Sequence, residues 1–316
     1  MRIVFMGTPE FGVPSLKALI EAGHEIVGVF CQPDRPKGRG NKTVMCPVKE
    51  EALKHGLPVF QPQRIRLDGA EALRSLSPDL CVTAAFGQIL SEENLAVPRL
   101  GTVNVHSSLL PKYRGSAPIN WAIINGETVT GVTTMLTDKG MDTGDILLQE
   151  RITIDPDITA GALTEQLAQV GARLLIQTIG LLEQGACPRA RQNEDEMSYY
   201  PMLTKDLGRI RFDKNAQEIR CLIRGVDPWP GAFTMIGGEM FKLWEAEALP
   251  TGGEGHDPGA ILCADAQQGL VIACGEGTCL RVNVLQAPGG KRMRAVDYLR
   301  GHQITATHTD PAKEEA

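Results

Sequence analysis

The stretch GTVNVHSSLLPKYRGSAPINWAIINGETVTGVTTMLTDKGMDTGD, residues 101–145, decides the fold and the chemistry expected of this chain. It opens with alternating apolar and polar residues over 102–106, a pattern that predicts a short β-strand with its two valines buried. Asn104 and His106 then share the opposite face, and His106 ends the strand. In open α/β sheets, ligands bind beyond the carboxyl ends of the strands. This amide and this imidazole are therefore candidate catalytic groups.

Carboxylates follow in the Gly-rich loop DKGMDTGD, residues 138–145. Asp138, Asp142 and Asp145 are all possible partners of the imidazole, and their spacing does not distinguish them, because such turns often need Asp for backbone hydrogen bonds. Between strand and loop, SLLPKYRG at Ser108–Gly115 places an apolar pair and a Pro-fixed turn before basic and aromatic side chains. We expect those basic and aromatic side chains to be exposed. A lone His at a strand end is usually structural, and these neighbours favour catalysis.

Together, NVHSSLLPKYRG and DKGMDTGD resemble the folate-dependent formyltransferase family, whose formyl donor is 10-formyltetrahydrofolate. The resemblance implies that Asn104, His106 and Asp142 are the catalytic residues. It also implies a folate site formed by a turn and by the segment that holds the pterin ring: Ser108, Leu109, Leu110, Pro111, Phe86, Gln88, Ile89 and Leu90. Core packing stays open as the alternative for Ile89 and Leu90, because short apolar runs are ambiguous.

Composition sets further bounds. A length of 316 residues suggests two domains. The eight cysteines include no CxxC pair, which argues against a structural zinc site or a disulfide framework and favours reduced thiols in the cytoplasm. We expect no metal cofactor and, since no apolar run reaches transmembrane length, no membrane partner. The net charge of −6 disfavours a nucleic-acid binder unless a local basic patch does the binding. A monomer is the default expectation.

The first part of the chain predicts a Rossmann-like α/β domain. Strand RIVFM at residues 2–6 leads through a turn to a helix from about residue 14. The GxGxxG fingerprint is absent, because Pro9 stands where its second Gly would be, and this disfavours a nicotinamide dehydrogenase. We expect further strands at 25–31, 58–60, 79–86, 131–137 and 145–154, and helices at 48–55, 70–76, 117–124 and 159–183, the last opened by Thr159 as a cap.

A long loop, residues 32–50, follows the second strand, and its Pro and Gly exclude regular structure over most of its length. Its cations could simply be solvated, but beside a carboxyl-edge site they suit a phosphate backbone. The loop resembles the basic insertion that methionyl-tRNA formyltransferases place against the acceptor arm of the initiator tRNA. That resemblance implies tRNA contacts by four cations: Arg35, Lys37, Arg39 and Lys42.

The sequence pattern changes beyond residue 206. Short β-rich runs separated by Gly-rich turns are typical of a small barrel. We expect strands at 232–236, 241–247, 260–263, 270–274 and 278–285, and helices at 215–224 and 294–301. The predicted organisation is thus a formyltransferase domain over 1–189, a linker over 190–206 and an OB-like barrel over 207–316.

Two segments of this barrel, VDPWPGAF at 226–233 and LQAPGGKRMRAVDYLRG at 285–301, resemble the tRNA-binding domain of methionyl-tRNA formyltransferases. The resemblance implies tRNA contacts by a second cluster of cations: Lys291, Arg292 and Arg294. One departure stands out, because Arg211 and Phe212 occupy the region where the family commonly carries a carboxylate and a Trp.

The activity that the resemblance implies is transfer of the formyl group to the α-amino group of methionine on initiator tRNA, a step of translation initiation. His106 would take the proton of the amine, Asp142 would orient the imidazole, and Asn104 would donate to the oxyanion. Formylation of a sugar-nucleotide amine uses the same residues and stays an alternative. Glycinamide ribonucleotide formylation normally needs the first domain alone, so the second domain disfavours it. A tRNA-binding protein that has lost catalysis is the alternative outside the enzymes.

Overall fold

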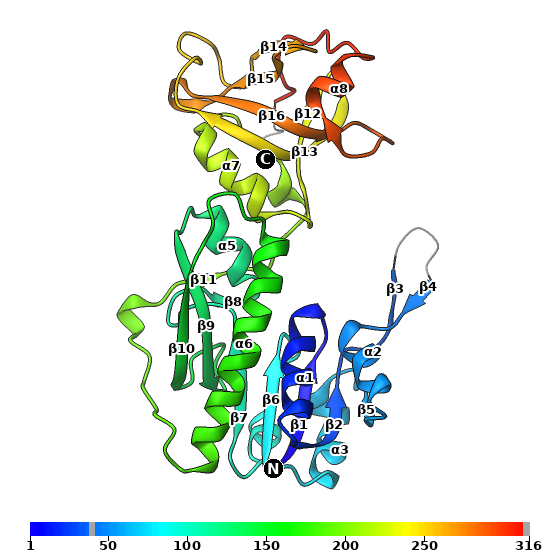
Figure 1. Ribbon diagram of the computed structural model, residues 1–316, viewed down its shortest axis with the longest axis vertical. Helices are drawn as coiled ribbons and strands as arrows, with labels where there is room; N and C mark the ends of the chain where they lie inside the picture. Colours follow the sequence, from blue (N-terminus) through cyan, green and yellow to red (C-terminus); the bar gives the residue numbers. More distant parts are fainter. Residues whose placement is uncertain (38–41, 312–316) are drawn as a thin grey trace. The chain divides into compact units, whose positions relative to one another are not determined.

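The structure is a computed structural model that describes residues 1–37 and 42–311, and it divides the chain into two compact units (Figure 1). The first comprises Met1–Pro118, Val129–Thr153 and Leu163–Tyr200, and the second comprises Ile119–Thr128, Ile154–Ala162 and Pro201–Ala316. The chain therefore crosses between the units more than once. Most of the expected linker, up to Tyr200, belongs to the first unit.

In its described residues, the first unit is built on a seven-stranded sheet in the order β10-β9-β7-β6-β1-β2-β5. The strands are β1 (Arg2–Gly7), β2 (Glu25–Phe30), β5 (Val59–Phe60), β6 (Leu80–Ala84), β7 (Thr102–His106), β9 (Val129–Leu136) and β10 (Ile146–Thr153). The five neighbouring strands β7-β6-β1-β2-β5 pair in parallel, and β9 and β10 add an antiparallel edge. The expected Rossmann-like fold is confirmed.

These strands could be predicted from the sequence because they are buried and therefore consist of continuous apolar runs. β6 is buried at every position, and β1 is buried at all but its first, as expected of parallel strands covered on both faces. The described helices of the first unit are α1 (Val13–Glu21), α2 (Pro47–Lys54), α3 (Ala70–Ser75), α4 (Glu92–Leu95) and most of α6 (Ala160–Glu183). Nearly all of α5 (Pro118–Ile124) belongs to the second unit. Gly171 lets α6 approach β7, since a Cβ there would come within 2.7 Å of Val105 Cγ1.

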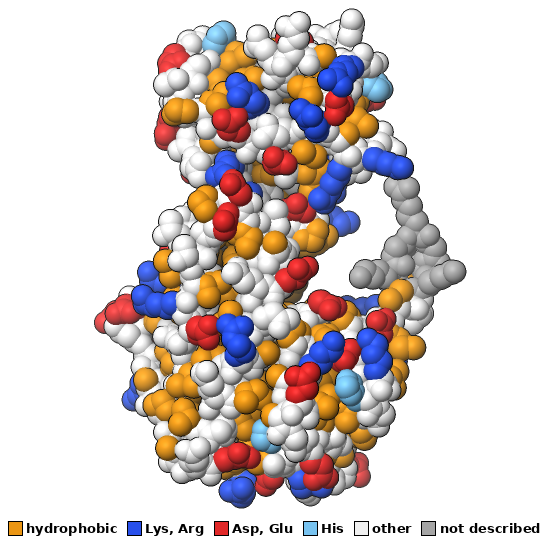
Figure 2. Space-filling view, viewed as in Figure 1, with side chains coloured by type: hydrophobic (Ala, Val, Ile, Leu, Met, Phe, Trp, Pro, Cys, Tyr) orange, Lys and Arg blue, Asp and Glu red, His pale blue; other side chains and the backbone are white. Residues whose placement is uncertain are grey.

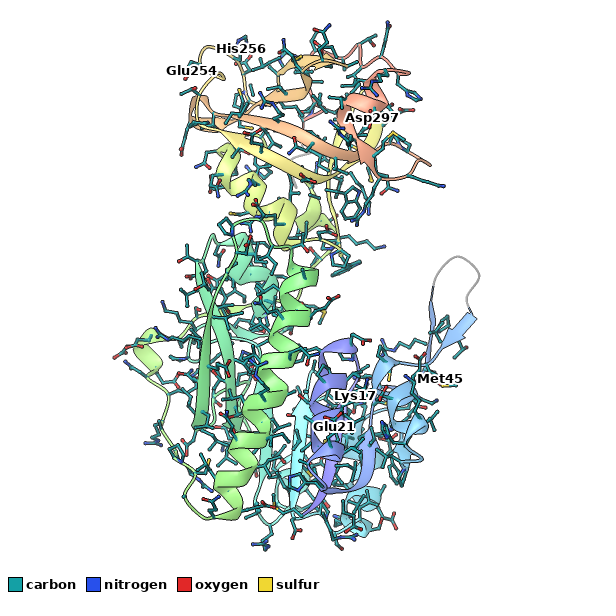
Figure 3. The ribbon with its side chains drawn as sticks, in the orientation of Figure 1. Lys17, Glu21, Met45, Glu254, His256 and Asp297 are labelled. Atoms are coloured by element: carbon teal, nitrogen blue, oxygen red, sulfur yellow. The ribbon has the colours of Figure 1, made fainter. Side chains whose placement is uncertain are left out.

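The start of α6 and one buried charge between α1 and α2 have defined partners. The Thr159 hydroxyl accepts a hydrogen bond from the Ala162 amide at 3.4 Å, which agrees with the expected cap of α6. Glu51 of α2 is only 5% exposed, and its carboxylate lies 3.6 Å from the Lys17 ammonium of α1, a residue labelled in Figure 3. Lys54 on the next turn of α2 pairs with the same carboxylate at 3.0 Å. With His55 Nε2 also at 3.1 Å, this buried carboxylate has three partners, and its contact with Lys17 ties α1 to α2.

Some short elements depart from the expectations. The basic loop holds an antiparallel pair, β3 (Arg35–Lys37) and β4 (Lys42–Val44). A second pair joins β8 (Arg114–Gly115) in parallel to β11 (Tyr199–Tyr200). A turn of π-helix covers Ile65–Gly69. Elements this short show no period in the sequence, so only the contacts of the folded chain define them.

The second unit contains a curled antiparallel sheet. The described strands run in the order β12-β13-β16-β15-β14, with β17 beside β16. They are β12 (Ala232–Ile236), β13 (Glu239–Leu249), β14 (Ile261–Asp265), β15 (Gly269–Ala273), β16 (Cys279–Gln286) and β17 (Met293–Arg294), with helices α7 (Ala216–Gly225) and α8 (Ala295–Leu299). Register shifts near the middle of β13 bend it around the core. The expected OB-like fold is confirmed.

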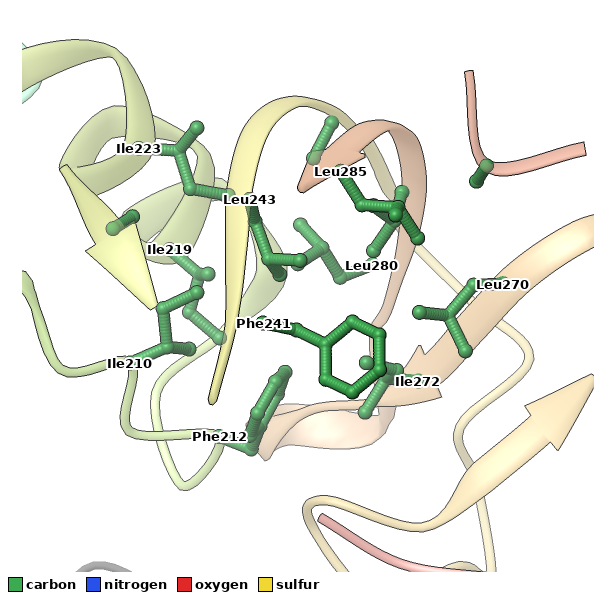
Figure 4. Close-up of a cluster of buried hydrophobic side chains, with 14 of the residues drawn as sticks. Ile210, Phe212, Ile219, Ile223, Phe241, Leu243, Leu270, Ile272, Leu280 and Leu285 are labelled. Carbon is green, nitrogen blue, oxygen red and sulfur yellow. The ribbon is translucent and has the colours of Figure 1, made fainter. Parts of the chain in front are cut away.

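The core of the second unit lies between this sheet and α7. Ile219 and Ile223 of α7 meet Phe241 and Leu243 of β13 and the apolar side chains of β15 and β16 (Figure 4). Phe212 is 7% exposed and joins this core, whereas its neighbour Arg211 is exposed and pairs with Asp213 at 3.0 Å. The Phe that departs from the family pattern is thus a core residue. None of the described helices combines the length and the apolar character that crossing a membrane requires.

Candidate active site

Asn104 and His106 lie at the carboxyl end of β7, in the middle of the first sheet. β7 pairs in parallel with β6, so that Thr83 and Asn104 are partners in register. The Thr83 hydroxyl donates a hydrogen bond to Asn104 Oδ1 at 2.9 Å. Because the oxygen of the amide is engaged in this way, Nδ2 is the end that remains for the site, and it points toward Asp142 Oδ1 at 3.5 Å.

His106 is 6% exposed, and its two ring nitrogens have different neighbours. Nε2 lies 3.0 Å from the carbonyl oxygen of Tyr113. A carbonyl only accepts, so this contact places a hydrogen on Nε2. Nδ1 lies 3.6 Å from Asp142 Oδ1, on the side of the ring that faces the Gly-rich loop. In the neutral ring, Nδ1 is therefore the nitrogen that can accept a proton.

The geometry of the Gly-rich loop distinguishes Asp142 from Asp138. Asp142 Oδ2 accepts a hydrogen bond from the Gly115 amide at 3.0 Å, which leaves Oδ1 facing Asn104 and His106. Asp138 Oδ1 instead accepts from the Gly140 amide and the Thr143 hydroxyl, at 3.0 and 2.7 Å, and so stabilises its own turn. Asp142 is brought to the histidine, and Asp138 is not.

The predicted folate turn is rigidly built. Ser108 is 1% exposed, and its hydroxyl donates to the carbonyl of Lys112 at 2.7 Å. Thr133 of β9 donates to the Ser108 carbonyl at 2.7 Å and accepts from the Leu110 amide at 3.1 Å. Leu110 is buried, whereas Leu109 and Pro111 are partly exposed. The turn is thus fastened to the sheet beside the end of β7.

The predicted pterin segment follows β6, the neighbour of β7. Phe86 and Leu90 are buried, at 4% and 8% exposure, and pack in the core, whereas Ile89 is 64% exposed. Gln88 has a structural task, since its Oε1 accepts from the Ile65 amide at 2.6 Å and its Nε2 donates to the Pro62 carbonyl at 3.0 Å. Core packing, the alternative left open for both residues, therefore holds for Leu90 and not for Ile89.

The second half of SLLPKYRG differs from expectation. Tyr113 and Arg114 are buried, at 7% and 3% exposure, because residues of the expected linker cover them. The Tyr113 ring stacks on Tyr200 with centroids 4.9 Å apart. Arg114 Nε and Nη2 donate to Gln192 Oε1 at 3.1 and 2.8 Å, and two further bonds of 2.9 and 2.8 Å join the guanidinium to Glu194. Our expectation of exposed side chains is wrong for these two residues.

No pattern in the sequence predicted a role for Gln192 or Glu194. They lie in the polar segment RQNEDE, four of whose six residues are charged, a composition typical of a solvated linker. The contact with Arg114 spans 78 positions of the chain, so it leaves no local pattern. One signal was available: a charged residue inside a motif that ends a strand needs a partner if it is buried.

The cations predicted to contact tRNA lie in both units. Arg35 is exposed and Lys37 follows it on β3, Lys42 begins β4, and Arg39 lies outside the described residues. In the second unit, Lys291, Arg292 and Arg294 are exposed, on β17 or just before it. On the face seen in Figure 2, Lys and Arg side chains are interspersed with Asp and Glu, as a net charge of −6 requires.

Arg292 has partners of its own within the second unit. Its guanidinium lies 3.3 Å from the centroid of the Trp244 ring and donates to Asp227 at 3.1 Å. Lys242 approaches the same ring at 5.4 Å. A cation stacked on an indole ring is held in place more firmly than a free surface Arg. Within residues 1–37 and 42–311, no three His, Cys, Asp or Glu side chains gather closely enough to hold a metal ion.

Comparisons with known proteins cover both units. Residues 1–179 match the family model described as formyl transferase, and residues 202–303 match that of the formyl transferase C-terminal domain. The chain is 48% identical over 305 residues to the methionyl-tRNA formyltransferase of Acetivibrio thermocellus, covering 96% of this chain and 97% of the relative. It is 46% identical over 305 residues to that of Clostridioides difficile, covering 96% and 98%.

Among solved structures, the chain resembles an N-formyltransferase from Helicobacter canadensis in complex with folinic acid and dTDP-3-aminofucose. The TM-score is 0.67 at 21% identity, over 89% of this chain and 98% of that one. HypX from Aquifex aeolicus in complex with tetrahydrofolic acid gives a TM-score of 0.64 at 17% identity, over 100% of this chain and 50% of that one. At these identities the likeness shows the fold alone.

Proposed function

This chain belongs to the formyl transferase family, and we propose that it transfers the formyl group of 10-formyltetrahydrofolate to the α-amino group of methionine carried by initiator tRNA. The observation that carries the proposal is the convergence of Asn104, His106 and Asp142, with Asp142 Oδ1 at 3.5 Å from Asn104 Nδ2 and 3.6 Å from His106 Nδ1. Relatives named for this activity match the chain almost from end to end, through both units.

His106 acts as the general base in this mechanism. An α-amino group has a pKa near 8, so a useful fraction of the methionyl amine is neutral at cellular pH. As the amine attacks the formyl carbon, its proton passes to His106 Nδ1, because Nε2 already carries the hydrogen that the Tyr113 carbonyl accepts. The Asp142 carboxylate, beside Nδ1, stabilises the positive charge that develops on the ring. The imidazolium then returns the proton to the departing nitrogen of the folate.

Asn104 stabilises the negative charge that forms on the formyl oxygen. Its Nδ2 donates to that oxygen, while the Thr83 hydroxyl holds the other end of the amide. Preorganised donors of this kind need no rearrangement during the reaction, and loss of one typically costs about a hundredfold or more in rate. In this division of roles, the carboxylate at 3.5 Å keeps the amide directed at the reacting group.

The segments next to β6 and β7 fit the folate substrate. The described residues offer the backbone amides of Gln88 to Leu90 no backbone acceptor, so these amides are free to donate to a heterocyclic ring. Ile89, 64% exposed, supplies an apolar side chain against which a ring can lie. Ser108 to Pro111 would form the opposite wall, since the turn is fastened to β9 through Thr133.

The cations of both units supply the proposed contacts to the tRNA. Positive side chains that neutralise phosphates contribute most of the affinity for nucleic acid. The proposed contacts in the first unit are Arg35, Lys37, Arg39 and Lys42, and those in the second are Lys291, Arg292 and Arg294. We place the reaction in the cytoplasm, which suits a chain whose eight cysteines are all free. We propose that the chain acts as a monomer, and light scattering will test this.

Transfer of labelled formyl from 10-formyltetrahydrofolate to charged initiator tRNA tests the function, with elongator methionyl-tRNA as the matched acceptor. Transfer to the initiator alone supports the proposal. If neither tRNA is formylated by a preparation that binds the folate, the acceptor is a different amine, and a sugar-nucleotide amine is the next to assay. Failure to turn over the folate with any amine would instead indicate a binding protein without catalysis. Asn104→Ala and His106→Ala each remove most turnover while leaving the fold intact.

A further inference from the structure

We propose that Gln192, held in turn by Arg114, is a positioning residue that fixes the loop bearing Asp142 in its working geometry. The inference rests on the proposed function, because it assigns Asp142 a part in formyl transfer. Its basis is a set of partly buried contacts between two segments that are distant in the sequence. Each contact can be altered by a substitution that leaves Asn104, His106 and Asp142 in place.

The amide of Gln192 uses its full hydrogen-bonding capacity. Its Nε2 donates to the carbonyl of Asp142 at 2.7 Å and to the carbonyl of Gly144 at 2.8 Å, one hydrogen to each. Its Oε1 accepts two bonds from Arg114, at 3.1 and 2.8 Å. A side chain with two donors and two acceptor sites, all engaged, has one orientation available to it. It therefore holds the Gly-rich loop at two points.

The Asp142 backbone needs such support. Its φ angle is 56°, in the left-handed region that side-chain-bearing residues rarely adopt. A residue in this conformation persists only where its surroundings determine it. Gln192 binds the Asp142 carbonyl, and the Gly115 amide binds the Asp142 carboxylate at 3.0 Å, so the residue is held at both its backbone and its side chain.

Arg114 makes the support rigid from behind. The side chain is 3% exposed, and its charge is balanced by Glu194 through two bonds of 2.9 and 2.8 Å. The hydrogen bonds from Arg114 also lower the pKa of the Glu194 carboxyl, so this partner stays ionised at neutral pH. A backbone bridge joins Ile146, the residue after the loop, to Ala190, two residues before Gln192, and so anchors the segment that carries Gln192. Thus Glu194 orients Arg114, Arg114 orients Gln192, and Gln192 fixes Asp142.

Gln192→Glu is the decisive variant. It keeps the size of the side chain and its bonds to Arg114, but it replaces the two donated hydrogens with an oxygen facing two carbonyl oxygens. Gln192→Ala removes all four bonds and serves as the second variant. The matched control is Gln177→Glu, the same change at an exposed position on α6. Each protein is assayed for formyl transfer to initiator methionyl-tRNA, for its melting temperature, and for hydrogen exchange of the Gly115 amide.

We expect kcat to fall about tenfold or more in Gln192→Glu, since the variant loses both of the hydrogen bonds that hold the loop. The KM values for folate and tRNA change less than about threefold, and the melting temperature stays within a few degrees of wild type, because the bond to Arg114 is kept. Exchange of the Gly115 amide becomes faster, since its acceptor is the Asp142 carboxylate. Gln177→Glu changes none of these values.

Two results would overturn the inference. Wild-type kcat in Gln192→Glu, with Gly115 still protected, would mean that the loop holds its geometry unaided. A parallel loss of melting temperature and of protection throughout the first unit would show a general structural role. If the wild-type chain itself fails to formylate the tRNA, the proposed function fails, and the exchange of the Gly115 amide still decides whether Gln192 holds the loop.

Discussion

Replacing Thr83 with Val tests the mechanism at its most specific hydrogen bond. The substitution removes one hydroxyl and leaves the branched shape of the side chain. In the wild type, this hydroxyl is nearly buried, at 8% exposure, and donates to Asn104 Oδ1 at 2.9 Å. Without it, nothing on β6 distinguishes the oxygen of the Asn104 amide from its nitrogen. The donor to the oxyanion then loses part of its orientation, while the amide itself remains.

The expected losses in kcat differ between removal of the Thr83–Asn104 hydrogen bond and removal of the Asn104 amide. A neutral hydrogen bond contributes about 0.5–1.5 kcal/mol net, which corresponds to a factor of about 2 to 12. We therefore expect kcat of Thr83→Val to fall by about three- to tenfold. Removal of the amide in Asn104→Ala eliminates the oxyanion donor and costs about a hundred- to a thousandfold. The two variants are well separated in rate, so their combination is informative.

The assay is single-turnover formyl transfer by the wild type, both single variants and the double variant. If Thr83 acts only through Asn104, Thr83→Val has no further effect in the Asn104→Ala background, and the cycle shows full coupling. Thr178→Val is the control, because this buried hydroxyl bonds to Thr134 at 2.7 Å and should reduce stability without affecting kcat. Equal losses from Thr83→Val in both backgrounds would refute the reasoning, and so would an unchanged rate.

Cys46 should react first with iodoacetamide at neutral pH, because a hydrogen bond from the Cys31 thiol lowers its pKa to about 6; Cys31→Ala should abolish this preference in peptide mass spectra. Asp34→Asn should cost about 1 kcal/mol at neutral pH, since the hydrogen bond from Lys49 lowers the pKa of the Asp34 carboxyl. That contribution is complete above the unfolded pKa and is lost as pH falls through the folded one, so denaturant unfolding should show the difference shrinking in acid. Arg35→Glu should raise the KM for charged tRNA severalfold, and added salt should reduce this effect.

The sheet of the first unit was predictable because its strands are continuous apolar runs. β6 and β7 lie within the expected ranges, and the alternation over 102–106 correctly separated the buried valines from Asn104 and His106. The carboxyl-edge rule then placed the amide and imidazole together. What spacing could not do was select Asp142 over Asp138. That choice depends on which carboxylate the Gly115 amide meets, a contact across 27 positions of the chain.

The ion pair between buried Arg114 and exposed Glu194 was unpredictable for a related reason. Arg114 stands in the short basic string KYRG, and Glu194 stands in a run of charges, so the local sequence predicts that both side chains are solvated. They meet only because β8 pairs with β11, two strands of two residues each. Strands this short carry no period of their own, and the sheet register that joins them is a property of the folded unit. Local patterns therefore predicted the elements and missed the segment that returns over them.

The return of this segment explains why KYRG belongs to the motif at all. Its last three residues each hold a different part of the site: the Tyr113 carbonyl accepts from His106, Arg114 holds Gln192, and the Gly115 amide holds Asp142. Orientation of the imidazole thus comes from a backbone carbonyl at 3.0 Å, whereas the Asp142 carboxylate at 3.6 Å is too distant for a good hydrogen bond and acts through its charge. The linker residues that cover Tyr113 and Arg114 thereby help to fix the contacts of this motif with His106 and Gln192.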